Sequence, residues 1–200
     1  MGVQAVLAAE ARRLNRAAGA PPVPALFFFT DPKRTPDPLA VARALPRGAG
    51  LVYRHFGAAG RGPVARALAR TCRSRGLTLL IAADPELAAR VGAAGVHWPE
   101  RLLPARREAG HGALVTAAAH GAGALAKAAA YGADAAVLSP VFPTESASAN
   151  APLGLFRASQ LARAAALPVL ALGGISTRNA RLLAGRGFAG LVSVGALSGA

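Results

Sequence analysis

In Pro168-Val169-Leu170-Ala171-Leu172-Gly173-Gly174-Ile175-Ser176-Thr177, a short apolar run leads into two glycines and then into a helix-start signal. A strand that ends in glycines and opens into a helix lets backbone N–H groups approach an anion closely, with the helix dipole behind them. A second apolar run, Leu191-Val192-Ser193-Val194, ends at Gly195. Two such turns near the end of a chain are typical of the phosphate site that the loops after strands 7 and 8 build in a (β/α)8 barrel. The alternative is that these glycines only make tight turns.

Short apolar runs alternate with Ala- and Arg-rich stretches along the chain, which is the pattern of βα units around a parallel sheet. Such short apolar strands suit the inner wall of a barrel that helices cover from outside. The sequence predicts strands at 25–30, 50–54, 78–82, 95–98, 113–117, 135–138, 168–172 and 190–194. It predicts helices at 37–44, 62–75, 84–91, 101–109, 121–131, 156–165 and 177–186.

A further segment precedes the first predicted strand. From Val3 to Ala18, apolar residues recur at helical spacing beside arginines, which predicts an amphipathic helix. Residues 197–200 are too few for an outer helix after the eighth strand, so we predict that the N-terminal helix fills that place. The expected fold is a single-domain (β/α)8 TIM barrel over residues 25–200, without a full C-terminal helix. Residues 1–24 form the extra helix and a proline-rich lead-in.

Composition narrows the class of protein. The 200 residues are 53% hydrophobic, yet no apolar run approaches the roughly 18 residues of a membrane helix. The N-terminus lacks the pattern of a secretory signal, and the single cysteine, Cys72, fits a reducing compartment, so we expect a cytoplasmic protein without a membrane partner. The net charge of +14 comes from scattered arginines, not basic tracts interleaved with aromatics. We therefore expect no nucleic-acid partner, but a field that attracts phosphorylated small molecules.

Motifs at the strand ends resemble those of the thiamine-phosphate synthase / thiazole tautomerase (TenI) family, and the chain is identified as a diverged member. The resemblance implies a (β/α)8 barrel of thiamine biosynthesis. The family's synthase joins an aminopyrimidine diphosphate to a thiazole phosphate with Mg²⁺ and releases diphosphate, whereas its tautomerase isomerises a thiazole carboxylate phosphate. The matching motifs, between Leu26 and Leu197, are Leu26-Phe27-Phe28-Phe29-Thr30-Asp31, Val52-Tyr53-Arg54, Gly92-Ala93-Ala94-Gly95-Val96-His97, Ser139-Pro140-Val141-Phe142-Pro143-Thr144 and Leu172-Gly173-Gly174-Ile175.

The same resemblance marks positions where this chain departs from the synthase. Expelling diphosphate needs cations on the leaving group. The two Mg²⁺ aspartates of the synthase pattern correspond to Ala83 and Leu102, and a lysine of the pattern corresponds to Phe56. Asp84 and Glu100 are the nearest carboxylates, and Asp84 before a proline is better explained as a helix N-cap. No metal ligand is predicted, and Mg²⁺ is expected only if synthase activity persists.

Phosphate contacts can persist where side-chain chemistry is lost, since backbone donors need only glycine and geometry. His97 lies at a strand end, where barrels place catalytic groups, although a buried structural histidine is the alternative. For Arg54, a surface arginine at a strand end is the alternative to a phosphate contact. The predicted binding residues are Arg54, Ser139, Thr144, Ser146, Gly173, Gly174, Gly195 and Ala196. The predicted catalytic residues are His97, His120 and Thr144, with Ser139 and Glu100 as further candidates.

These residues predict a thiamine-biosynthesis-related barrel that binds a phosphorylated thiazole, thiamine phosphate or a similar heteroaromatic monophosphate at its C-terminal mouth. The replaced Mg²⁺ and diphosphate residues argue against full synthase activity. The alternative is a non-catalytic sensor, carrier or partner subunit that has kept the phosphate pocket. A basic nucleic-acid-binding barrel is a third reading, which predicts affinity that falls steeply with salt. The sequence leaves open whether the chain forms a homo-oligomer.

Overall fold

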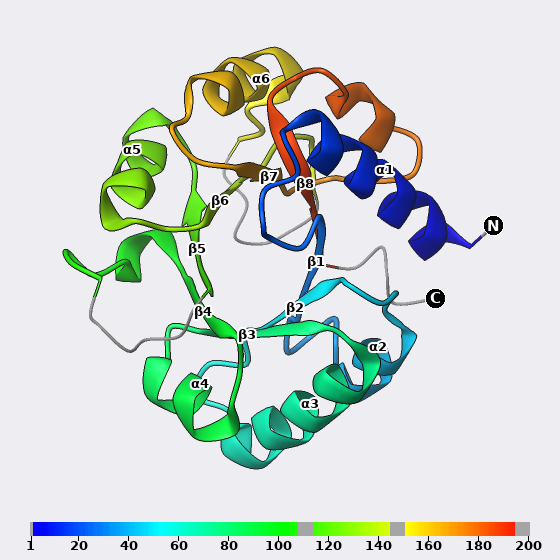
Figure 1. Ribbon diagram of the computed structural model, residues 1–200, viewed down its shortest axis with the longest axis vertical. Helices are drawn as coiled ribbons and strands as arrows, with labels where there is room; N and C mark the ends of the chain where they lie inside the picture. Colours follow the sequence, from blue (N-terminus) through cyan, green and yellow to red (C-terminus); the bar gives the residue numbers. More distant parts are fainter. Residues whose placement is uncertain (1, 108–113, 145–150, 195–200) are drawn as a thin grey trace.

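Eight parallel strands close into a barrel, in which each strand pairs with the next and β8 pairs back to β1 (Figure 1). The structure is a computed structural model that describes residues 2–107, 114–144 and 151–194. This closed sheet confirms the predicted single-domain (β/α)8 fold. The strands are β1 (Leu26–Phe29), β2 (Gly50–Tyr53), β3 (Thr78–Ala82), β4 (Gly95–Trp98), β5 (Leu114–Ala119), β6 (Ala135–Leu138), β7 (Val169–Ala171) and β8 (Phe188–Ser193).

Helices surround the ring of strands (Figure 1). Several end at a glycine in the left-handed conformation, as at Gly76, Gly92 and Gly132, which is the usual way to terminate a helix. The α-helices are α1 (Val3–Ala17), α2 (Pro38–Ala44), α3 (Arg61–Arg75), α4 (Pro85–Val91), α5 (Ala122–Tyr131) and α6 (Gly154–Ala164). Two short 3-10 helices, η1 (Glu100–Leu102) and η2 (Ala180–Leu183), complete the described part of the chain.

Two predicted α-helices are wrong in the described residues. The segment predicted as helix 101–109 forms η1, and residues 103–107 are not helical. Pro104 lacks an N–H and clashes with the preceding turn, which explains the early stop. The segment predicted as helix 177–186 forms a turn followed by η2. There the Asn179 side chain accepts the Ser176 N–H (2.8 Å) and so offers the backbone an alternative to an α-helix.

The helix α1 covers the barrel beside β8 and β1, where the sequence predicts it (Figure 1). Its buried residues, Leu7, Ala8, Ala11 and Leu14, recur at helical spacing on one face. Burying this apolar face against the strands stabilises a helix whose other side carries arginines.

Side chains that point inward from the strands fill the barrel interior, and those that point outward pack under the helices. The interior cluster includes Phe27 and Phe29 of β1, and a Cβ added to Gly50 would lie 2.2 Å from the Phe27 ring. Gly50 therefore makes room for this aromatic ring. Because all the strands are parallel, their carboxyl ends meet at one edge, which is where barrels place their sites. No helix in the described ranges is both long and apolar enough to cross a membrane.

Candidate functional site

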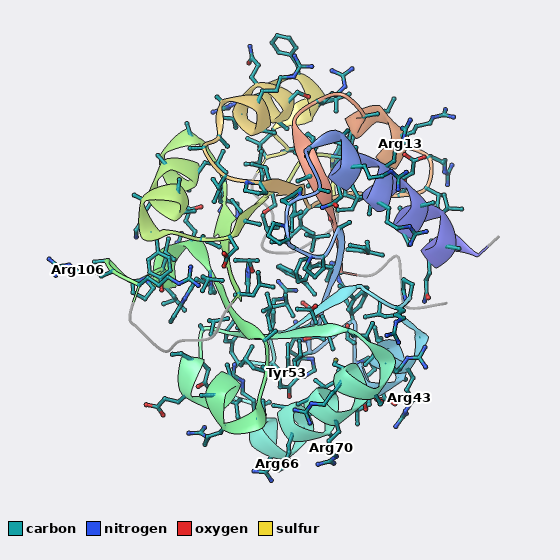
Figure 2. All side chains as sticks on the ribbon, in the orientation of Figure 1. Arg13, Arg43, Tyr53, Arg66, Arg70 and Arg106 are labelled. Atoms are coloured by element: carbon teal, nitrogen blue, oxygen red, sulfur yellow. The ribbon has the colours of Figure 1, made fainter. Side chains whose placement is uncertain are left out.

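Arginines occupy two different kinds of position. Figure 2 shows Arg43, Arg66 and Arg70 pointing away from the barrel on α2 and α3, as solvated surface charges do. The side chains of Arg54 and Arg61 are only 27% and 16% exposed, respectively, and they make hydrogen bonds at strand ends. The fold therefore holds these two cations at the carboxyl ends of the strands.

Arg54 follows β2 and is fixed against the end of β1. Its backbone N–H donates to Thr30 Oγ1 (2.9 Å), and its Nε donates to the Thr30 carbonyl oxygen (2.8 Å). The guanidinium carbon lies 5.3 Å from the Phe29 ring centroid, and Nη2 lies 3.8 Å from Asp31 Oδ2. Burial lowers the pKa of Arg54, while the Asp31 carboxylate opposes that shift. An arginine stays charged under such conditions, so the end of β2 holds a permanent cation.

His97 is enclosed in the barrel. It is 2% exposed, its Nδ1 lies 2.9 Å from Thr116 Oγ1, and its ring meets Phe29 edge-on at 4.6 Å between centroids. Burial, assisted by the charge of Arg54, lowers the pKa of His97 to about 3. The imidazole is therefore neutral near pH 7. These contacts support the structural alternative for His97, and its catalytic role stays a prediction.

His120 and Glu100 form a pair between the loops that follow β5 and β4. Glu100 Oε2 accepts the His120 backbone N–H (2.9 Å) and lies 2.6 Å from His120 Nδ1. The side chains are 40% and 37% exposed, so both remain accessible. In the tautomer that donates from Nδ1, the carboxylate fixes the ring and leaves Nε2 as an acceptor. This is the geometry of an oriented base. No pattern in the sequence indicates that the two residues meet.

Arg61 is a site residue that the sequence reasoning missed. It opens α3, and its Nη1 lies 2.6 Å from Asp84 Oδ2 while its Nη2 donates to the Ala82 carbonyl oxygen (2.7 Å). Asp84 Oδ1 also accepts the Leu87 N–H (2.8 Å), which confirms the predicted N-cap of α4. Nothing in the sequence distinguishes Arg61 from the other arginines, because its partner lies on a different loop.

The glycine turn after β7 lies against the loop that follows β6. Gly173 and Gly174 have φ of +100° and +61°. A Cβ on Gly173 would lie 2.7 Å from Pro140 Cα, and one on Gly174 would lie 2.2 Å from the Pro143 carbonyl oxygen. The Phe142 N–H donates to the Gly173 carbonyl oxygen (3.0 Å). Both glycines thus have the structural role of allowing two loops to approach closely.

The same turn also leaves donors available. The backbone N–H groups of Gly173, Gly174 and Ile175 donate no hydrogen bond to the residues that the structure describes. Asn179 braces the turn, since its Oδ1 accepts the Ser176 N–H (2.8 Å) and its Nδ2 donates to the Gly174 carbonyl oxygen (2.7 Å). Successive N–H groups around left-handed residues form concave anion sites. The turn is therefore suited to an anion, although η2 replaces the α-helix whose dipole was expected behind it.

We expect the substitution Asn179→Asp to lower the free energy of unfolding by about 1–2 kcal/mol, because the carboxylate still accepts the Ser176 N–H but donates nothing to Gly174. Asn179→Ala removes both bonds and should cost more. Urea unfolding measures both, with the exposed neighbour Arg178→Ala as a control. Equal stability of Asn179→Ala and the unmodified protein would contradict a bracing role.

The remaining predicted site residues make fewer contacts that bear on function. Ser139 and Thr144 are half-buried in the loop after β6. Phe56, in the loop after β2, and Leu102, the last residue of η1, are 51% and 55% exposed. No group of three or more His, Cys, Asp or Glu side chains within the described ranges is placed to hold a metal ion. Ser146, Gly195 and Ala196 lie outside the described residues.

The chain is similar to known proteins over most of its length. The family model of thiamine monophosphate synthases matches residues 26–197. The thiamine-phosphate synthase of Marinobacter nauticus is 38% identical over 185 residues, which cover 88% of this chain and 83% of the relative. That of Chlorobium luteolum is 35% identical over 185 residues, covering 89% and 87%. In structure, the chain resembles thiamine phosphate pyrophosphorylase from Pyrococcus furiosus, with a TM-score of 0.71 and 23% identity over 84% of each chain.

Proposed function

Because the chain belongs to the thiamine monophosphate synthase family, we propose that its barrel binds a phosphorylated thiazole or thiamine phosphate at the carboxyl ends of its strands. The observation that carries this proposal is the turn of Gly173, Gly174 and Ile175, whose N–H groups donate to no described residue. Arg54 adds a fixed cation at the same edge of the sheet. Phe56, which is 51% exposed and whose ring centroid lies 5.8 Å from the Arg61 guanidinium carbon, supplies an aromatic surface for a heteroaromatic ring.

We propose further that ligand binding is retained without efficient Mg²⁺-dependent condensation. The positions that the resemblance marks for Mg²⁺ carry Ala83 and Leu102, which have no oxygen ligand in the side chain. For proton transfer to or from a bound ligand, the oriented pair of His120 and Glu100 is the best-placed group. A carrier, sensor or partner subunit has the same ligand site and no turnover.

We expect isothermal calorimetry to give a dissociation constant on the order of micromolar for thiamine phosphate or thiazole phosphate. Unphosphorylated thiamine is the matched control and should bind at least about tenfold more weakly, because it lacks the group that the N–H donors recognise. Incubation with the aminopyrimidine diphosphate, thiazole phosphate and Mg²⁺ should yield no rapid release of diphosphate. Rapid release would restore the synthase assignment, and equal affinity for thiamine would place the phosphate away from the glycine turn.

A further inference from the structure

The protein already engages the carboxylates of Asp31 and Asp84, which follow β1 and β3, and of Glu100, which opens η1. Asp31 Oδ1 accepts the Lys33 and Arg34 N–H groups, and Asp31 Oδ2 lies 3.8 Å from Arg54 Nη2. Asp84 has the Leu87 N–H on one oxygen and the Arg61 guanidinium on the other. A cation at Asp84 would have to displace Arg61, and a cation at Asp31 would lie beside the positive charge of Arg54.

Glu100 is engaged through one oxygen and is otherwise accessible. One of its oxygens, Oε2, receives both the backbone N–H and the Nδ1 of His120. Mg²⁺ demands near-octahedral oxygen ligands and in proteins usually takes one or two free carboxylates together with substrate phosphates. The donor set at this mouth therefore does not fit Mg²⁺: both aspartates face a guanidinium group, Glu100 offers only Oε1, and no three such side chains in the described ranges come together to hold a metal ion.

Arg61 is the cation that the fold provides instead. The guanidinium spans the end of β3, from the Ala82 carbonyl oxygen to the Asp84 carboxylate, and its Nε is buried without a hydrogen-bond partner among the described residues. Two of its five N–H groups make these bonds, which hold the fork in one orientation. A buried, unpaired donor is costly and is more typical of a functional site than of a surface ion pair.

From this arrangement we infer that Arg61 takes the place of a divalent cation at the end of β3, so that the chain binds its phosphorylated ligand without Mg²⁺. The inference rests on the proposed phosphate-ligand function. Guanidinium groups bind phosphate oxygens through paired N–H donors and need no dehydration of a metal ion. Arg54, which follows β2, and Arg61, which opens α3 and contacts the end of β3, together then supply the positive charge.

The backbone beside Asp84 allows a direct test of this replacement. Ala83 has φ of +51°, a conformation that alanine rarely adopts and that Asp and Asn tolerate better. The double variant Ala83→Asp/Arg61→Gln therefore places a second carboxylate beside Asp84 and removes the guanidinium that neutralises it. The matched control is Ala83→Asn/Arg61→Gln, which has the same backbone preference and one carboxylate fewer.

Two measurements decide the inference. Binding of Mn²⁺, followed by electron paramagnetic resonance, should be undetectable in the unmodified protein and in the Asn control, and detectable in the Asp double variant. Binding of thiamine phosphate to the unmodified protein, followed by calorimetry, should be the same in EDTA and in Mg²⁺. Arg61→Gln alone should weaken that binding by about tenfold in EDTA, and Arg61→Lys by less, because it keeps the charge but not the fork.

The outcomes separate this inference from the proposed function. Mn²⁺ binding by the unmodified protein that disappears in Asp84→Asn would overturn the inference, as would thiamine phosphate affinity that rises about tenfold with Mg²⁺. An Asp double variant that stays folded, as shown by its circular dichroism, yet binds no Mn²⁺ would also count against it. If thiamine phosphate binds in neither buffer, the proposed function fails, while the Mn²⁺ titrations still decide whether Arg61 occupies the cation position.

Discussion

Replacing Gly174 with alanine is expected to weaken the binding of thiamine phosphate by at least about a hundredfold, which corresponds to about 2.7 kcal/mol. The added Cβ would lie 2.2 Å from the Pro143 carbonyl oxygen and 2.9 Å from Phe142 Cβ. Backbone atoms cannot rotate away as a flexible side chain can, so the loop after β6 must shift or the glycine turn must open. Either movement disperses the N–H groups on which the proposed phosphate site depends. Calorimetric titration measures the loss directly.

The matched control for this variant is Gly185→Ala. Gly185 has φ of +67°, close to the +61° of Gly174, but a Cβ at Gly185 meets nothing within 4 Å. The two substitutions therefore carry a similar backbone strain of about 1–2 kcal/mol, and only the first adds a steric conflict. Gly185→Ala should lower the melting temperature modestly and leave thiamine phosphate binding intact. If Gly174→Ala melts cooperatively and binds like the unmodified protein, the glycine turn is not the phosphate site.

The barrel was predictable from sequence because its strands are encoded locally. Runs such as Thr78–Ala82 and Ala135–Leu138 are short, apolar and bounded by turn signals, and the structure has strands with these bounds. Left-handed glycines after α3 and α4 give equally local stop signals. The strand β8 begins at Phe188, although the sequence predicts a start at residue 190. Phe188 is buried among the side chains that pack between the strands and the helices.

The contacts of the candidate site could be predicted much less well. Arg61 meets Asp84 across 23 residues of sequence, and His120 meets Glu100 across 20. Such pairs depend on where two loops leave the barrel, which no local pattern specifies. The Asp84 N-cap was predictable because both partners lie within one turn of α4. The turn of Gly173 and Gly174 combines both cases. The glycines themselves are evident in the sequence, but their contact with the loop after β6 is not.

Stability of the fold should fall steeply in mild acid because of His97. The pKa of this histidine is about 3 in the folded protein, since burial and Arg54 disfavour the charged form, whereas an unfolded histidine has its ordinary value of about 6.5. Above about pH 6.5 the histidine is neutral in both the folded and the unfolded protein, so the free energy of unfolding has its full value. As the pH falls below that point, the unfolded chain binds a proton that the folded chain does not. The free energy of unfolding should therefore decrease by about 1.4 kcal/mol per pH unit between these two values.

Urea unfolding measured at a series of pH values tests this slope, with His97→Asn as the informative variant. An asparagine places a hydrogen-bonding atom near the position of Nδ1 and can keep the bond to Thr116, but it does not titrate. Burial also lowers the pKa of His55, which would make the free energy of unfolding depend on pH in the same direction. His55→Gln is therefore the control that removes this second contribution. The pKa of Asp31 is lowered from its ordinary value of 3.8, so this carboxylate adds to the slope only below about pH 4. A slope that persists in His97→Asn would show that the acid sensitivity has another source, whereas its loss would fix His97 as a neutral structural residue of the barrel.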